Sequence, residues 1–224
     1  MTLRCGLLLV RSKITDAALT PVVFRQWYEQ VHIPHLLGTG KIPASARYTL
    51  SSSSPPPEDG QEPTRPYLAV YPVTDLDWLK TPDCSFFKIP LHDELLPNAS
   101  KFVYDVAAFD ARFFERVVGV ESRVVRGPAK HLIIVLISLE AAGQQEPESL
   151  LHASLPVGEP DRSTLFKFEF APGAKEGSAE KLAGYVAVHE FTMLPGGVTG
   201  AKQAGFESAT YNFLSSFGDI EIKI

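Results

Sequence analysis

Short apolar runs separated by polar turns predict a chain built mainly from strands. Residues 5–13, 44–50 and 67–73 are each too short and too apolar for a surface helix, so we expect three covered strands. Between the first two runs, the spacing of apolar residues changes from that of a strand to that of a helix. The residues on this helical stripe are Phe24, Trp27, Tyr28, Val31 and His35.

The ends of this first helix are predicted from local chemistry. Thr20 suits the N-cap and Pro21 the first helical position, where the missing proline N–H costs nothing. Pro34 removes a backbone donor and clashes with the preceding turn, so the helix should end or kink around residues 30–33. His32 is therefore expected in the last turn.

The remaining segments complete one structural unit and begin another. A helix is expected within residues 76–100 and a fourth strand at 101–107, which gives the β-α-β-β-α-β order of a ferredoxin-like unit. The second half repeats this order less completely. Its expected strands are residues 131–139, 165–170, 185–193 and 220–224, and its expected helices are 148–155 and 201–217.

An internal match supports duplication. Residues 67–74 (YLAVYPVT) and 185–192 (YVAVHEFT) agree at four of eight positions, although two apolar strands can also match by chance. We therefore predict an α+β fold with two tandem ferredoxin-like halves, residues 1–118 and 119–224. Their sheets would form an intramolecular pseudo-dimeric α/β barrel, with the first helix of the second half eroded.

Composition narrows the function classes. The chain is 45% hydrophobic and 21% charged with a net charge of −5, so a nucleic-acid-binding surface is not expected. The longest apolar run, residues 132–139, is too short to cross a membrane as a helix. Cys5 and Cys84 have no metal-ligand spacing, and no phosphate-binding loop is present. We expect a cytoplasmic protein without a metal.

Residues 20–35 (TPVVFRQWYEQVHIPH) carry a family resemblance. This segment, with Arg47-Tyr48 in the next strand, resembles EthD-type proteins of the dimeric α/β-barrel superfamily. The tandem arrangement resembles tailoring enzymes of fungal natural-product pathways, and that resemblance implies cofactor-free decarboxylases, cyclases or isomerases. Related barrels hold haem through one histidine, so haem binding stays open.

His32 is the predicted catalytic residue. At the end of a helix it would meet the negative end of the helix dipole, which favours the protonated imidazole. Such a group can exchange one proton near neutral pH, as keto–enol, dehydration and decarboxylation steps require. Alternatively, His32 only caps carbonyls and packs against Tyr28. His35 is expected to have a packing role.

Substrate-binding residues are predicted from the repeated strands and the aromatic positions. Tyr71 and His189 occupy matching places, and their polar tips would face one ligand if that sheet face lines the barrel; core packing is the alternative. The complete expected set is Tyr28, Tyr48, Tyr71, His189 and Trp78. Asp110 and Arg112 are expected to form an ion pair that pins the linker.

These observations predict a cofactor-independent enzyme acting on a hydrophobic, oxygenated small molecule. Proton transfer and preorganisation in a dry pocket would promote cyclisation, isomerisation, dehydration or decarboxylation, in secondary-metabolite biosynthesis. The alternative is a non-catalytic carrier with the same barrel pocket. The sequence is compatible with a monomer or a homodimer. It does not identify the substrate, and it does not show whether dioxygen takes part in the reaction.

Overall fold

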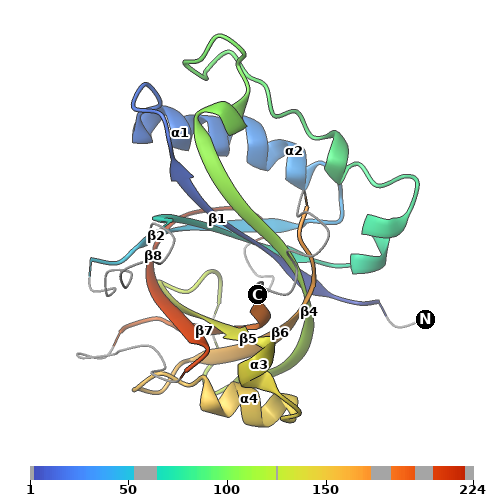
Figure 1. Cartoon of the computed structure of the whole chain (residues 1–224), viewed down its shortest axis with the longest axis vertical. Helices are drawn as coiled ribbons and strands as arrows, with labels where there is room; N and C mark the ends of the chain where they lie inside the picture. The colour runs from blue at the N-terminus through green and yellow to red at the C-terminus, as the bar shows by residue number, and fades with distance from the viewer. Residues whose placement is uncertain (1–2, 53–64, 125, 173–182, 195–203, 220–224) are drawn as a thin grey trace.

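The computed structural model describes residues 3–52, 65–124, 126–172, 183–194 and 204–219. Eight antiparallel strands close into a barrel in the order β1-β3-β2-β8-β5-β7-β6-β4 (Figure 1). The strands are β1 (Gly6–Ile14), β2 (Ala44–Leu50), β3 (Tyr67–Val73), β4 (Ala107–Glu121), β5 (His131–Ser138), β6 (Arg162–Phe170), β7 (Ala183–Phe191) and β8 (Phe206–Gly218).

The strand order within each half of the chain is the same. The first four strands lie side by side as β4-β1-β3-β2, and the last four lie as β8-β5-β7-β6. Pairing of β2 with β8 and of β4 with β6 closes the barrel between the halves. The internally similar segments therefore occupy the same place in each set of four strands, because one forms β3 and the other β7.

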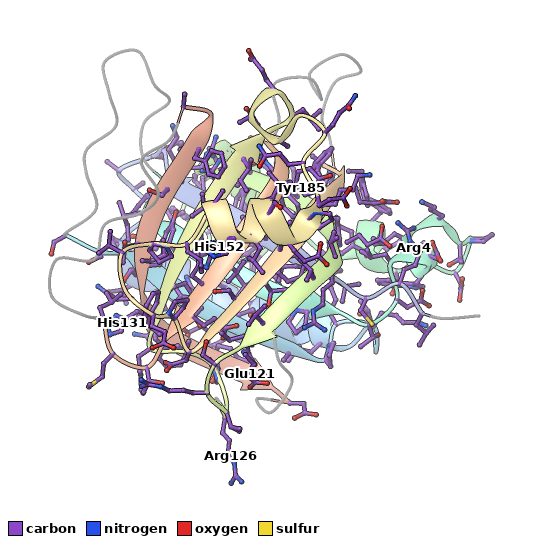
Figure 2. The ribbon with its side chains drawn as sticks, turned by 90° about the horizontal axis from the view of Figure 1, so that it is seen from below. Arg4, Glu121, Arg126, His131, His152 and Tyr185 are labelled. Atoms are coloured by element: carbon purple, nitrogen blue, oxygen red, sulfur yellow. The ribbon has the colours of Figure 1, made fainter. Side chains whose placement is uncertain are left out.

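Helices cover two opposite outer sides of the barrel (Figure 1). One side carries α1 (Pro21–Trp27), the π-helical segment η1 (Tyr28–His32) and α2 (Ile33–Leu37). The other carries α3 (Leu139–Ala142) and α4 (Pro147–Ala153). Seen from below, α4 with His152 lies across the strands of the second half (Figure 2). Each half thus buries one sheet face under its own helices.

The barrel interior is filled by the side chains of all eight strands. Alternate positions of each strand point inward, as the two-residue period of a strand requires. The inward set includes Leu9, Tyr48, Val70, Phe114, Leu132, Phe166, Val188 and Tyr211, all of them buried. Tyr71 and His189 do not belong to this inward set, because they lie at the alternate positions of β3 and β7, so the expectation that both face one ligand inside the barrel was wrong.

The first helix does not end near residue 30. Pro34 would clash with the carbonyl of an ordinary α-helical turn, and the chain responds by widening into the π-helical segment η1. The Ile33 N–H donates to the Tyr28 carbonyl, five residues back. The helix then continues through α2, so the distortion expected around residues 30–33 is a π-helical bulge, and the expectation that His32 lies in the last turn was wrong.

Other expected elements changed type. The segment 76–100 contains only the short 3₁₀ turns η2 (Leu76–Lys80) and η3 (Phe86–Lys88) where a helix was expected. The segment 101–107 contains η4 (Val103–Asp105), and the strand begins only at Ala107.

The last expected helix was also wrong. Strand β8 occupies most of residues 201–217, because this segment pairs with β2 on one side and with β5 on the other. Residues 220–224, expected as a strand, lie outside the described residues. In the second half, the helical region expected at 148–155 is confirmed by α4.

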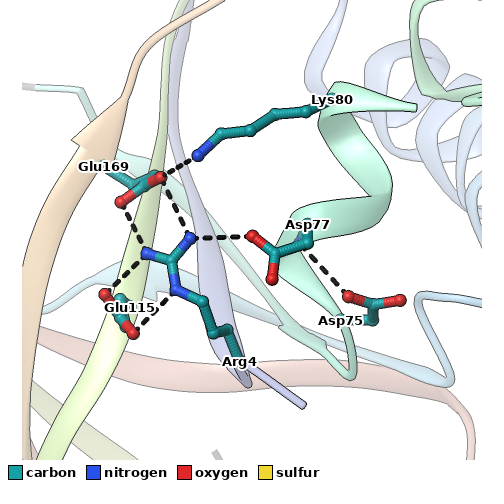
Figure 3. Close-up of polar contacts among 6 residues, drawn as sticks. All are labelled: Arg4, Asp75, Asp77, Lys80, Glu115 and Glu169. Carbon is teal, nitrogen blue, oxygen red and sulfur yellow. Dashed lines mark hydrogen bonds and ion pairs between the residues drawn. The ribbon is translucent and has the colours of Figure 1, made fainter. Parts of the chain in front are cut away.

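A cluster of charges ties the start of β1 to three other elements (Figure 3). The Arg4 guanidinium donates to Glu115 on β4, Glu169 on β6 and Asp77 in η2, at 2.7–3.4 Å. Lys80 also reaches Glu169, at 2.8 Å. At the opposite end of β4, the predicted pair of Asp110 and Arg112 is confirmed at 2.7 Å, within the strand itself.

None of the described helices has the length and apolar content needed to cross a membrane.

Candidate functional site between the first helix and the sheet

Polar side chains gather where α1 and η1 pack on the outer face of β2 and β3. Ser45 and Arg47 alternate with the inward Ala46 and Tyr48, so they point to the helix side of the sheet. Ala46 pairs with Val70, which places Tyr71 opposite Ser45 on the neighbouring strand. From the helix, Tyr28 and His32 meet this face, and both come from the π-helical segment.

Aromatic rings fix the orientation of His32. Its imidazole stacks on Trp27 with centroids 5.0 Å apart and an interplanar angle of 16°. It also meets Tyr28 edge-on at 5.3 Å and 80°. The guanidinium of Arg47 lies over the Tyr28 ring, 4.5 Å from its centroid. The bulge at residues 28–32 turns both side chains toward the sheet.

Five buried polar atoms in this layer have no hydrogen-bond partner in the described part of the chain. Buried polar groups in proteins are normally paired, so a cluster of exceptions points to a bound water or a ligand. Three of the atoms belong to residues of the helix, one belongs to β2 and one to β3. They are Trp27 Nε1, Tyr28 Oη, His32 Nδ1, Ser45 Oγ and Tyr71 Oη.

Burial and one cation set the protonation states. Burial, helped by His35 and Arg47, lowers the pKa of His32 from 6.5 to about 4. Burial raises the pKa of Tyr28 to about 12 and that of Tyr71 well above 10, while Arg47 opposes both shifts. At neutral pH the site therefore presents a neutral imidazole and two protonated phenols. The expectation that His32 is held protonated was wrong, because it lies inside a continuous helix and is desolvated.

The other predicted site residues do not join this cluster. Tyr48 points into the barrel, where its hydroxyl donates to the Ala129 carbonyl at 3.1 Å. Trp78 is buried in η2 within the apolar core on the helix side, and no ring contact links it to His32 in the described segments. Of the five expected substrate-binding residues, Tyr28 contacts His32, and Tyr71 lies beside Tyr28 in the same layer.

His189 serves the other half of the molecule. It is fully buried under α4, with Nδ1 2.9 Å from Ser163 Oγ and Nε2 3.2 Å from Ser154 Oγ. Ser154 donates its own hydroxyl to the Leu151 carbonyl, so it accepts a hydrogen bond from Nε2, and Nδ1 accepts from Ser163. Burial lowers the pKa of His189 to about 4. Both nitrogens are occupied by protein, which is the arrangement of a structural histidine.

Sequence reasoning missed Ser45, Arg47, Glu29 and Trp27 as members of the site. A signal for Arg47 existed, since a charged residue in the middle of a short apolar strand needs a buried partner. That partner is Glu29, one helical position after Tyr28. Placing Tyr48 on the inner face by alternation would have assigned Arg47 to the helix side.

A surface cleft of about 420 Å³ lies on the outer side of the same helix. Its walls include Gln30, Val31 and Pro34 from the helix and Lys88 and Ile89 from the facing loop. His35 also borders this cleft, is exposed, and has Nδ1 2.7 Å from the Val31 carbonyl, so it is not the packing residue that was expected. Across the described segments, no group of three His, Cys, Asp or Glu side chains could hold a metal ion.

No family model and no curated protein sequence matches this chain. Solved structures do match its fold. An anthrone oxidase-like protein superposes with a TM-score of 0.51 at 10% identity, covering 96% of this chain and 93% of the other. A candidate monooxygenase from Fusobacterium nucleatum superposes with a TM-score of 0.54 at 7% identity, covering 99% and 98%. The chain therefore shares its overall fold with these structures.

Proposed function

We propose that this protein is a cofactor-independent enzyme that moves a proton on a hydrophobic, oxygenated small molecule. The observation that carries the proposal is the group of unpartnered buried polar atoms around His32. In the proposed reaction His32 Nδ1 takes a proton from the substrate, while the hydroxyls of Tyr28 and Tyr71 donate hydrogen bonds to its oxygen atoms. A neutral imidazole and neutral phenols at pH 7 suit these roles.

The surroundings favour a flat, apolar substrate. The rings of Phe24 and Phe109 pack against Tyr28 at 5.4 and 6.4 Å, so the polar atoms lie within an aromatic layer. A desolvated setting strengthens each hydrogen bond to the substrate and excludes water from reactive intermediates. Cyclisation, isomerisation and dehydration can begin with such a proton transfer, whereas a decarboxylation ends with delivery of a proton to the enolate that remains after CO2 leaves.

Oxidation is the second candidate reaction. The names of two structural neighbours, anthrone oxidase-like protein and candidate monooxygenase, suggest that a deprotonated substrate of this chain could react with dioxygen. A third possibility is a carrier that binds the same molecule in the same layer without converting it. These alternatives differ in product and in oxygen consumption.

We further propose that the barrel is an intramolecular pseudo-dimer of two ferredoxin-like halves, as in tandem EthD-type proteins. The repeated strand order and the equivalent places of β3 and β7 support this proposal. The proposed site then belongs to the first half alone, and His189 occupies the matching place in a half that has lost the function. A fungal biosynthetic role and a cytoplasmic location remain parts of the same proposal.

The test uses a panel of enolisable and phenolic ketones in D₂O buffer, with and without air. We expect the protein to accelerate loss of the acidic C–H signal in ¹H NMR for at least one compound, and mass spectrometry to identify any product. An oxygen electrode separates oxidation from the other reactions. Binding without exchange or product would instead identify a carrier.

The decisive variant is His32→Ala, for which we expect turnover to fall by about 10² or more with the fold retained. His35→Ala is the matched control, because this histidine lies three residues away on the exposed side of the same helix. Full activity in His32→Ala on a compound that the wild type converts would overturn the role given to His32.

A further inference from the structure

Arg47 is a buried cation at the centre of the candidate site. Only 2% of its surface is exposed, although it carries a permanent charge in the middle of β2. Its Nη1 donates to Glu29 Oε1 at 3.2 Å, and its plane lies over the Tyr28 ring. This is the hydrogen bond that the guanidinium makes among the described residues.

Glu29 divides its charge among several partners. Its Oε1 atom also accepts from Arg25 Nε at 3.0 Å and from Ser215 Oγ on β8 at 2.7 Å. The carboxylate therefore holds Arg47 in place but neutralises it incompletely. The remaining positive field reaches the site, because Arg47 lowers the pKa values of His32, Tyr28 and Tyr71.

We infer that Arg47, together with the Tyr28 and Tyr71 hydroxyls, forms an oxyanion-binding site whose ligand is a phenolate or enolate. Arg47 is a cation, and the hydroxyls of Tyr28, Tyr71 and Ser45 are three further groups that can donate in the same helix–sheet layer as His32. Such a set is complementary to a molecule that carries negative charge on oxygen, and it is a poor match for a cation. This inference rests on the proposed function and names the chemical form that the site stabilises.

The step that uses the site balances without a further reactant. The substrate C–H or O–H bond breaks, its proton goes to His32 Nδ1, and the electron pair remains on the substrate as an enolate or phenolate oxygen. Arg47 then faces the new anion, and the imidazolium and the anion neutralise each other. Glu29 acts as a positioning residue, since in this proposal it acts on the ligand only through Arg47.

The test measures the preference for an anion directly, with 4-nitrophenol as the probe. Its ionised form absorbs in the visible, so titration with and without protein gives the pH of half-ionisation of the bound probe. We expect binding to lower this pH by at least about one unit, which corresponds to at least tenfold tighter binding of the phenolate than of the phenol. Equal affinity for both forms, or no binding of either, would overturn the inference.

Variants separate charge from shape. Arg47→Gln should abolish the shift, and Arg47→Lys should keep part of it, while the exposed Arg123→Gln serves as a control without effect. If Arg47→Gln does not fold, the double variant Glu29→Gln with Arg47→Gln removes both partners of the ion pair and tests the same point. A folded variant without the cation that still lowers the half-ionisation pH refutes the role of Arg47.

Two further variants assign the remaining roles. Glu29→Gln retains an acceptor for Nη1 and should preserve the shift, whereas Glu29→Ala should weaken it because Arg47 loses its support. Equal shifts in both variants would refute the positioning role. His32→Ala should keep the phenolate preference and lose turnover, so a failure of the oxyanion site and a failure of the proposed reaction give different results.

Discussion

Tyr71 and His189 occupy equivalent strand positions 118 residues apart, yet they point to opposite outer sides of the barrel. Tyr71 lies under α1, where its hydroxyl has no partner in the described chain, and His189 lies under α4 with both ring nitrogens occupied. The contrast distinguishes the two halves. Among the described residues, the layer under α1 retains unsatisfied polar atoms, whereas the histidine in the layer under α4 is satisfied.

A pH profile tests the state of His32. Because burial lowers its pKa to about 4, the neutral base should be fully present at pH 6.5 and disappear only as the pH falls through about 4. We therefore expect kcat on a converted compound to stay level from about pH 5.5 to 7.5 and to fall below that range. A loss of activity centred near pH 6.5 would show an exposed, ordinary imidazole.

Two tyrosine-to-phenylalanine changes should affect stability differently. Tyr71→Phe removes a hydroxyl that lies near the Tyr28 and Ser45 hydroxyls but makes no well-formed hydrogen bond in the described chain, so the free energy of unfolding should change by no more than about 0.5 kcal/mol or rise. Tyr48→Phe removes the hydrogen bond to Ala129 and should cost about 1 kcal/mol. Urea unfolding of both variants gives the comparison, and an equal loss in both would mean that Tyr71 is satisfied in solution.

His189 should make the protein sensitive to mild acid. Its pKa is about 4 in the folded state and near 6.5 in the unfolded chain, so the unfolded state binds more protons between these values. The free energy of unfolding should therefore fall as pH drops from about 6.5 to about 4, by about 3 kcal/mol from this residue. His189→Gln should flatten the slope in that window, and His35→Gln should leave it unchanged.

The barrel interior contains an ion pair that should tolerate little change. Arg162 and Glu190 are buried, with two hydrogen bonds of 2.6 Å, and burial raises the pKa of Glu190. Glu190→Gln leaves the buried Arg162 cation without its counter-charge and should lower the free energy of unfolding by about 3–5 kcal/mol, measured by thermal or urea unfolding. Glu115→Gln in the partly exposed Arg4 cluster is the control, with an expected loss of about 1 kcal/mol or less.

The sequence determined the local elements whose pattern is strong. The apolar runs predicted β1, β2, β3, β5 and β7, because covered strands need continuous apolar residues. Thr20 and Pro21 located the start of the first helix, since capping is a property of two or three neighbouring residues. The internal repeat located two strands that occupy equivalent places in the barrel.

Only the tertiary structure decided which face each residue uses and what fills the barrel. A strand pattern shows that two faces exist, but pairing of β2 with β8 decides that Tyr48 points inward and that Arg47 lies under the helix. The widened turn at residues 28–32 depends on the fit of Pro34 to a helix packed on the sheet. The candidate site therefore arises from long-range packing, which brings His32, Arg47 and Tyr71 together from three separate elements.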